Sequence, residues 1–135
     1  MLKPPKVYFF DNADVLGDEG ARFENLVAAS LLKKIHFLED RDGYRYELRY
    51  IRDKEGREVD FAVIRDGRLE ELIETKYADE NVSGHLTYYA ERLKPERATQ
   101  IVAKLKRSYD KGKIKVTDPI TYFGKPAGAK PCGKR

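Results

Sequence analysis

The sequence has one cysteine, two histidines and no long apolar run. The single thiol of Cys132 cannot form an internal disulfide, and His36 and His85 lie too far apart in the chain to suggest a zinc site. No stretch approaches the roughly 20 apolar residues that a membrane helix needs, and the start Met-Leu-Lys-Pro-Pro is not that of a signal peptide. We therefore expect a cytoplasmic protein without a disulfide framework, structural zinc or membrane span.

Two functional motifs are also missing. There is no Gly-x-x-x-x-Gly-Lys-[Ser/Thr] phosphate loop, so an ATPase core is not expected, and no nucleophilic serine or cysteine constellation stands out. A chain of 135 residues, 37% charged and 41% hydrophobic, suits one well-solvated domain with its own core. We expect that domain to span residues 1–123 and residues 124–135 to form a basic, flexible tail.

Positive charge is concentrated in the last third of the chain. Between Lys94 and Lys115, eight basic residues stand against two acidic ones, and the stretch 124–135 is basic without any acid. A surface of this kind attracts the phosphates of nucleic acids. An ordinary solvated face followed by a tail is the alternative interpretation.

The hydrophobic pattern predicts an α/β fold. Apolar residues recur at helical spacing from Gly17 to Lys34, with Asp18 as the N-cap, and a second helix is expected from His85 to Leu93. Strands are expected at residues 6–10, 44–50, 57–64, 69–76, 99–105 and 114–123, the last broken by Pro119. The order helix, three-strand meander, helix, strand (αβββαβ) indicates a mixed sheet flanked by helices.

Charged side chains interrupt two apolar strands of this meander. Asp60 lies in the strand 57–64, and Glu74 and Lys76 flank Thr75 in the strand 69–76. Because side chains alternate along a strand, Glu74 and Lys76 share one face. An unpaired buried charge is costly, so these residues indicate a site that holds a cation and an anionic substrate.

Whether Asp60 and Glu74 meet depends on the turn between their strands. A two-residue turn at Asp66-Gly67 places the two side chains on opposite faces of the sheet. A three-residue loop, Arg65–Gly67, places them diagonally on one face, within reach of a shared ion. The hypothesis of a shared site therefore predicts the three-residue loop.

Paired carboxylates favour a divalent cation. They repel each other and favour protonation unless a cation lies between them, and their oxygens suit Mg²⁺ or Mn²⁺. Such an ion polarises a phosphodiester and lowers the pKa of a bound water, while Lys76 orients the water or neutralises the developing charge. Glu24 on the first helix and Thr75 are further candidate ligands. The alternatives are an exposed helix acid for Glu24 and a chance match for Glu74-x-Lys76.

These residues, in this order, resemble the PD-(D/E)xK nuclease superfamily, which has the restriction-endonuclease-like fold. The nearer resemblance is to the DUF4143 domain found at the C-terminus of many bacterial and archaeal AAA-type ATPases. It runs roughly from residue 6 to residue 123. The segments that carry it are 6–11, 20–25, 56–61 and 73–76 (KVYFFD, GARFEN, GREVDF and IETK).

The resemblance implies a Mg²⁺-dependent nuclease core. Asp60 and Glu74 would ligate the metal, Lys76 would be the catalytic lysine, and Glu24 would be the carboxylate supplied by the first helix. The implied partners are a nucleic acid, with DNA as the first choice, and an ATPase. Two other interpretations stay open: a catalytically inactive nucleic-acid-binding or protein-interaction module of the same fold, and a structural subunit that pairs through a strand edge.

Overall fold

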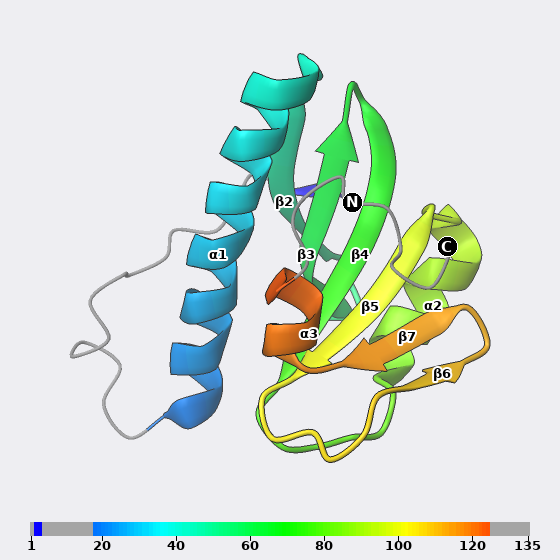
Figure 1. Ribbon diagram of the computed structural model, residues 1–135. Coiled ribbons are helices and arrows are strands. Elements are labelled where there is room, and N and C mark those ends of the chain that lie inside the picture. Colours follow the sequence, from blue (N-terminus) through cyan, green and yellow to red (C-terminus); the bar gives the residue numbers. More distant parts are fainter. Residues whose placement is uncertain (1, 4–17, 125–135) are drawn as a thin grey trace.

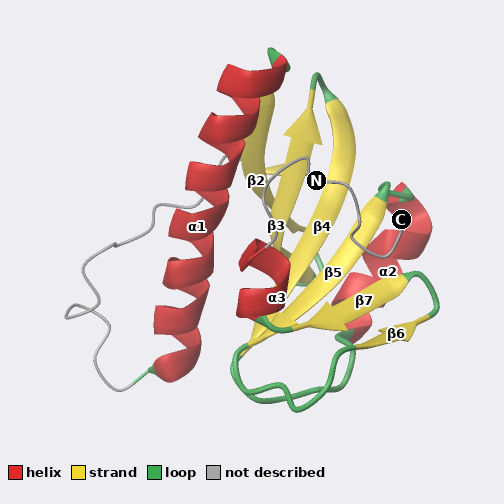
Figure 2. Cartoon of the chain, in the orientation of Figure 1, coloured by secondary structure: helices red, strands yellow, loops and turns green. Residues whose placement is uncertain are grey.

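The computed structural model describes residues 2–3 and 18–124, which form a mixed sheet between helices (Figures 1 and 2). In chain order the elements are β1 (Leu2–Lys3), α1 (Glu19–Asp42), β2 (Tyr46–Arg52), β3 (Glu58–Arg65), β4 (Arg68–Lys76), α2 (Gly84–Leu93), β5 (Arg97–Val102), β6 (Tyr109–Lys111), β7 (Ile114–Thr117) and α3 (Pro119–Gly124). The seven strands lie in the order β1-β2-β3-β4-β5-β7-β6. The predicted α/β class and the αβββαβ order of the core are confirmed.

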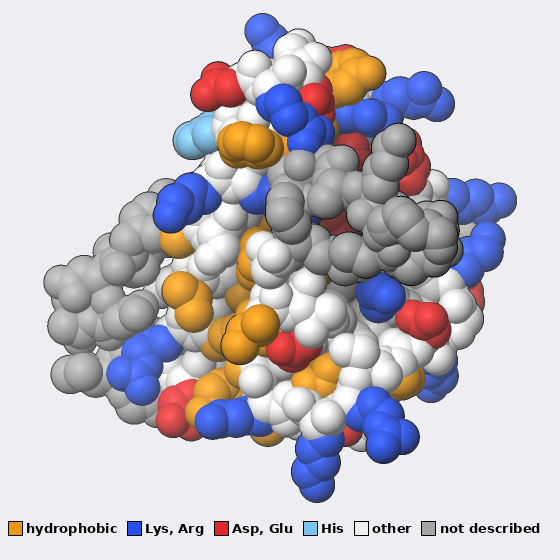
Figure 3. Space-filling view, in the orientation of Figure 1, with side chains coloured by type: hydrophobic (Ala, Val, Ile, Leu, Met, Phe, Trp, Pro, Cys, Tyr) orange, Lys and Arg blue, Asp and Glu red, His pale blue; other side chains and the backbone are white. Residues whose placement is uncertain are grey.

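The sheet is antiparallel from β1 to β4 and parallel from β4 through β5 to β7, with β6 added antiparallel at the edge. Helices α1 and α3 cover one face, and α2 covers the other (Figure 1). Each face has its own apolar core, built around Phe61 and Ile73 on the α1 side and around Leu72 and Tyr89 on the α2 side. In Figure 3 hydrophobic side chains gather between α1 and α3.

Helix α1 begins where the sequence predicts but ends later. The Asp18 side chain accepts a hydrogen bond from the Ala21 backbone N–H (3.0 Å), as an N-cap does. The expected end at Lys34 is wrong, because the helix continues to Asp42, with Ile35 buried and Leu38 partly buried against the core. Gly43 ends the helix in the left-handed conformation (φ 78°), which suits glycine.

The C-terminal part differs from the predicted strand 114–123. Strand β7 ends at Thr117, and Pro119 then opens helix α3, a position where its missing N–H costs no hydrogen bond. Strand β6, three exposed residues, was not predicted. The predicted strand 6–10, Cys132 and residues 125–135 of the predicted tail lie outside the described residues. No helix in the described part of the chain is long and apolar enough to cross a membrane.

A buried polar cluster fastens α3 to the sheet. Glu71 of β4 is only 3% exposed, and its carboxylate accepts hydrogen bonds from Thr99 Oγ1 and Tyr122 OH, both at 2.8 Å. Lys34 Nζ lies 4.5 Å from the centre of the Tyr122 ring. Burial lowers the pKa of Lys34, and the Glu71 carboxylate opposes that shift. The buried carboxylate is therefore stabilised by hydrogen bonds from β5 and α3.

The Tyr122→Phe variant is expected to lose about 1–2 kcal/mol of the free energy of unfolding, because buried Glu71 loses a donor. Urea unfolding measures the effect. Tyr44→Phe is the matched control, since Tyr44 is 44% exposed and its hydroxyl is not part of the cluster. Equal losses in the two variants would show that the Tyr122 hydroxyl does not stabilise Glu71.

Candidate functional site

The connection between β3 and β4 is a two-residue turn. Asp66 (φ 51°) and Gly67 (φ 81°) both have the positive φ that a type I′ hairpin turn requires, and Arg65 pairs with Arg68. The predicted three-residue loop is therefore wrong. This turn alone would place Asp60 and Glu74 on opposite faces of the sheet.

A β-bulge compensates for the shorter turn. Leu69 and Glu71 pair with the consecutive residues Ile64 and Val63, which leaves Glu70 as an extra residue on β4. Side chains alternate between the two faces along a strand. A shift of one residue in the pairing therefore moves every later β4 side chain to the opposite face relative to its β3 partner. The bulge thus returns Asp60 and Glu74 to one face, next to the pair Phe61 and Ile73, but not in the diagonal register that the longer loop was predicted to supply.

A second irregularity lies at Asp60 itself. Arg49 and Ile51 of β2 pair with Ala62 and Val59 of β3, so β3 carries one residue more than β2 across this step. Asp60 lies within that bulge. Bulges bend a strand and re-aim its side chains, and they are frequent beside active sites.

Asp60 and Glu74 are in direct contact. The Asp60 backbone N–H donates to Glu74 Oε1 (3.2 Å), while Thr75 donates to Asp60 Oδ2 through its backbone N–H (2.9 Å) and its Oγ1 (2.8 Å). One oxygen of each carboxylate is thereby fixed. Lys76 Nζ lies 3.9 Å from the other Glu74 oxygen, Oε2. The structure thus brings together Asp60, Glu74, Thr75 and Lys76.

The electrostatics of the pair favour a cation. Burial raises the pKa of Glu74 to about 8, and the neighbouring negative charge of Asp60 adds to the shift. The hydrogen bond from the Asp60 N–H and the charge of Lys76 lower the same pKa by less, and Glu24 of α1 raises it further. Without a metal, the folded state therefore favours the protonated form of Glu74.

The donor set fits a magnesium-type ion. Among the described residues, no three or more His, Cys, Asp and Glu side chains are arranged to hold one metal ion, so Glu24 does not form such a group with Asp60 and Glu74. Mg²⁺ commonly uses only one or two carboxylates and completes its shell with waters and substrate phosphate. Two adjacent carboxylates meet that requirement, while Glu24 and Thr75 as ligands stay predictions.

One family model matches most of the chain. The family model described as "Domain of unknown function (DUF4143)" matches residues 19–123, which include every candidate site residue. The chain belongs to the DUF4143 family. No curated protein and no solved structure matches it. The DUF4143 match extends from α1 into α3 and so covers both helical layers of the sheet.

Sequence analysis missed one residue beside the site of this DUF4143 chain. Gln100 of β5 is fully buried and pairs with Glu74 across the parallel ladder. Its Oε1 accepts from the Ser83 N–H (2.9 Å), and its Nε2 donates to the Asn81 carbonyl (2.8 Å). Gln100 therefore fixes the start of α2 beside the carboxylates. The feature of the sequence that points to Gln100 is its polar amide side chain within the mostly apolar segment 98–103.

The Thr75→Val variant of the DUF4143 chain is expected to weaken Mn²⁺ binding about tenfold, because Asp60 loses the hydroxyl donor that orients it. Titration calorimetry with Mn²⁺ measures the change. Thr75→Ser keeps the donor and serves as the control, with affinity close to wild type. Equal weakening in both variants would mean that the Thr75 methyl group, rather than its hydroxyl, supports the site.

Proposed function

We propose that this chain is a metal-dependent nuclease-like domain of the PD-(D/E)xK type, which hydrolyses phosphodiester bonds of nucleic acids, with DNA as the first candidate. The observation that carries the proposal is the contact between Asp60 and Glu74, with the Lys76 ammonium 3.9 Å from Glu74. Two adjacent carboxylates and a cationic side chain on neighbouring strands are what metal-assisted phosphoryl chemistry requires of a protein.

Each residue has a distinct role in this proposal. Asp60 and Glu74 would hold Mg²⁺ or Mn²⁺, and Thr75 fixes the orientation of Asp60. The bound ion would supply Lewis-acid polarisation of the phosphate and a more acidic water. Glu74 would have to lose its proton to hold the ion, and because its pKa is raised, metal binding would depend on pH.

Lys76 would act on the substrate. Its side chain is 34% exposed, so the ammonium reaches solvent while remaining beside Glu74. From this position it donates hydrogen bonds to the attacking water or to a phosphate oxygen as negative charge develops there. Glu24 contributes negative potential from α1, which favours a cation at the carboxylate pair.

A catalytically inactive nucleic-acid-binding module of the same fold is the second candidate. It is favoured by the protein partners that both carboxylates already have: Thr75 for Asp60, and the Asp60 N–H and Lys76 for Glu74. An ATPase partner is a further proposal, which rests on the family resemblance.

A cleavage assay separates the two candidates. Wild type and Asp60→Asn would be incubated with DNA and RNA substrates in Mg²⁺, in Mn²⁺ and in EDTA. We expect cleavage by wild type only when metal is present, and a loss of about a hundredfold or more in the variant. Equal cleavage by both proteins would indicate a contaminating nuclease, and binding without cleavage under all conditions would favour the inactive module.

A further inference from the structure

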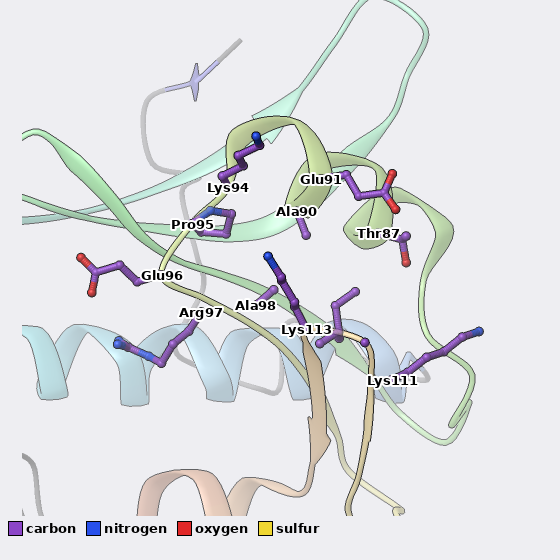
Figure 4. Close-up of a pocket in the computed structure, with 12 residues that line it drawn as sticks. Thr87, Ala90, Glu91, Lys94, Pro95, Glu96, Arg97, Ala98, Lys111 and Lys113 are labelled. Atoms are coloured by element: carbon purple, nitrogen blue, oxygen red, sulfur yellow. The ribbon is translucent and has the colours of Figure 1, made fainter.

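A cavity of about 930 Å³ lies on the α2 side of the sheet, and neither Asp60 nor Glu74 is among its lining residues. The end of α2, the start of β5 and the turn between β6 and β7 form its walls (Figure 4). The candidate active site does not include this cavity, and the description of the matching family assigns it no role. Its lining includes two ends of the basic segment 94–115 that stands out in the sequence.

The cavity lining has unpaired positive charge. Arg97 pairs with Glu70 (2.6 Å) and Glu96 with Arg65 (3.4 Å), so these lining charges are largely neutralised. Of the acidic lining residues, only Glu91 has no ion pair within the described part of the chain. Three exposed lysines of the lining likewise form no ion pair with a described residue: Lys94, Lys111 and Lys113.

The three lysines lie around the cavity on different parts of the chain. Lys94 caps α2, whereas Lys111 and Lys113 flank Gly112 at the hairpin turn. In Figure 4 Lys113 extends toward Ala90 and Pro95, while Lys94 and Lys111 reach outward from the two sides. Flexible lysine side chains on different elements can contact successive negative charges along a polymer, and they do not require a ligand of one rigid shape.

The cavity and the carboxylate pair lie on the same side of the sheet. Ala98 lines the cavity, and Gln100, two residues farther along β5, pairs with Glu74. Two strand residues span about 7 Å. Helix α2 runs from the carboxylate pair to the cavity. At its start the Ser83 N–H donates a hydrogen bond to Gln100, which lies beside Glu74, and its last turn forms part of the cavity wall. Its ten residues span about 15 Å.

We propose that this lysine-lined cavity binds the phosphate backbone of the nucleic-acid strand on one side of the bond to be cleaved. The proposal rests on the proposed nuclease function and gives it a substrate path. One strand of a duplex carries a phosphate for each 3.4 Å of axis. The length of α2, about 15 Å, therefore accommodates roughly four phosphates. The contacts are to backbone and carry no sequence information.

The test is a double variant, Lys111→Gln with Lys113→Gln, measured for binding to a fluorescein-labelled DNA hairpin in EDTA over a series of NaCl concentrations. We expect affinity to fall about tenfold at low salt and the slope of log K against log[NaCl] to decrease by about two. Lys94 is left unchanged because of its left-handed backbone (φ 49°).

The matched control is Lys33→Gln with Arg45→Gln, which removes the same charge from exposed residues that do not line the cavity. Equal affinities and salt slopes in the two double variants would overturn the proposal. So would an equal affinity for polyglutamate, which would make an acidic protein the occupant. Binding is measured in EDTA, where no cleavage is expected, so this test does not depend on turnover. Wild type that binds but does not cleave when Mg²⁺ or Mn²⁺ is added contradicts the nuclease, whereas metal-dependent cleavage with unaltered binding of the lysine variant contradicts only the cavity assignment.

Discussion

The Lys76→Ala variant is expected to cleave nucleic acid about a hundredfold or more slowly than wild type, while it keeps most of its affinity for Mn²⁺. The ammonium lies 3.9 Å from Glu74 Oε2, where it faces the oxygen not held by the Asp60 N–H. Removing one group that stabilises developing charge in an active site costs about 10²–10³ in turnover rate. Single-turnover cleavage at saturating Mn²⁺ measures this step without the contribution of metal binding.

Two further variants make this test specific. Lys33→Ala removes a lysine from the exposed surface of α1 and should cleave at the wild-type rate. Lys76→Arg keeps the charge with a different shape, so we expect partial recovery. If Lys76→Ala cleaves as fast as wild type, the lysine has no part in the chemistry and the assigned roles are wrong.

The Glu74→Gln variant is expected to be more stable than wild type in EDTA at alkaline pH, although it loses metal binding. The pKa of Glu74 is raised from 4.5 to about 8, so the folded state prefers the protonated carboxyl. The stability that this group contributes is therefore fully present below about pH 4.5 and is lost as the pH rises toward 8. Glutamine stays neutral and avoids that loss.

The expected difference is about 2 kcal/mol at pH 8.5, since one unit of pKa shift corresponds to about 1.4 kcal/mol and a coupled pair shares the shift. Urea unfolding at pH 5 and pH 8.5 measures it, and the two proteins should converge at the lower pH. Glu91→Gln, at an exposed position, should show no such pH dependence. A Glu74→Gln difference that is the same at both pH values would contradict the assigned pKa.

Most of the fold was predictable because long elements have strong periodic patterns. The apolar stripe of helix α1 runs from Phe23 to Ile35, and β3 and β4 are bounded by turn residues. The short C-terminal elements were not predictable in the same way. The sequence predicts that Pro119 breaks an edge strand, whereas Pro119 starts α3, which packs on the sheet through Tyr122. Such tertiary contacts leave no local periodicity.

The site shows the same division. Asp60, Glu74 and Lys76 were identified from the sequence because charge within apolar strands is conspicuous. The pairing of β3 with β4 could not be predicted in the same way, because it depends both on the turn at Asp66-Gly67 and on the bulge at Glu70. Each moves the partner of a β3 residue one position farther along β4, and together the two shifts return Asp60 and Glu74 to one face. A bulge depends on the packing of both strands, which single-strand alternation does not encode.

The most direct test of the central claim, that Asp60 and Glu74 together form a metal site, is a calorimetric Mn²⁺ titration of wild type, Asp60→Asn and Glu91→Gln. Binding by wild type and Glu91→Gln should be alike and should strengthen as the pH rises to about 8, where Glu74 loses its proton. Asp60→Asn should bind at least tenfold more weakly. Equal Mn²⁺ affinity in wild type and Asp60→Asn, or no binding by wild type, would contradict the account.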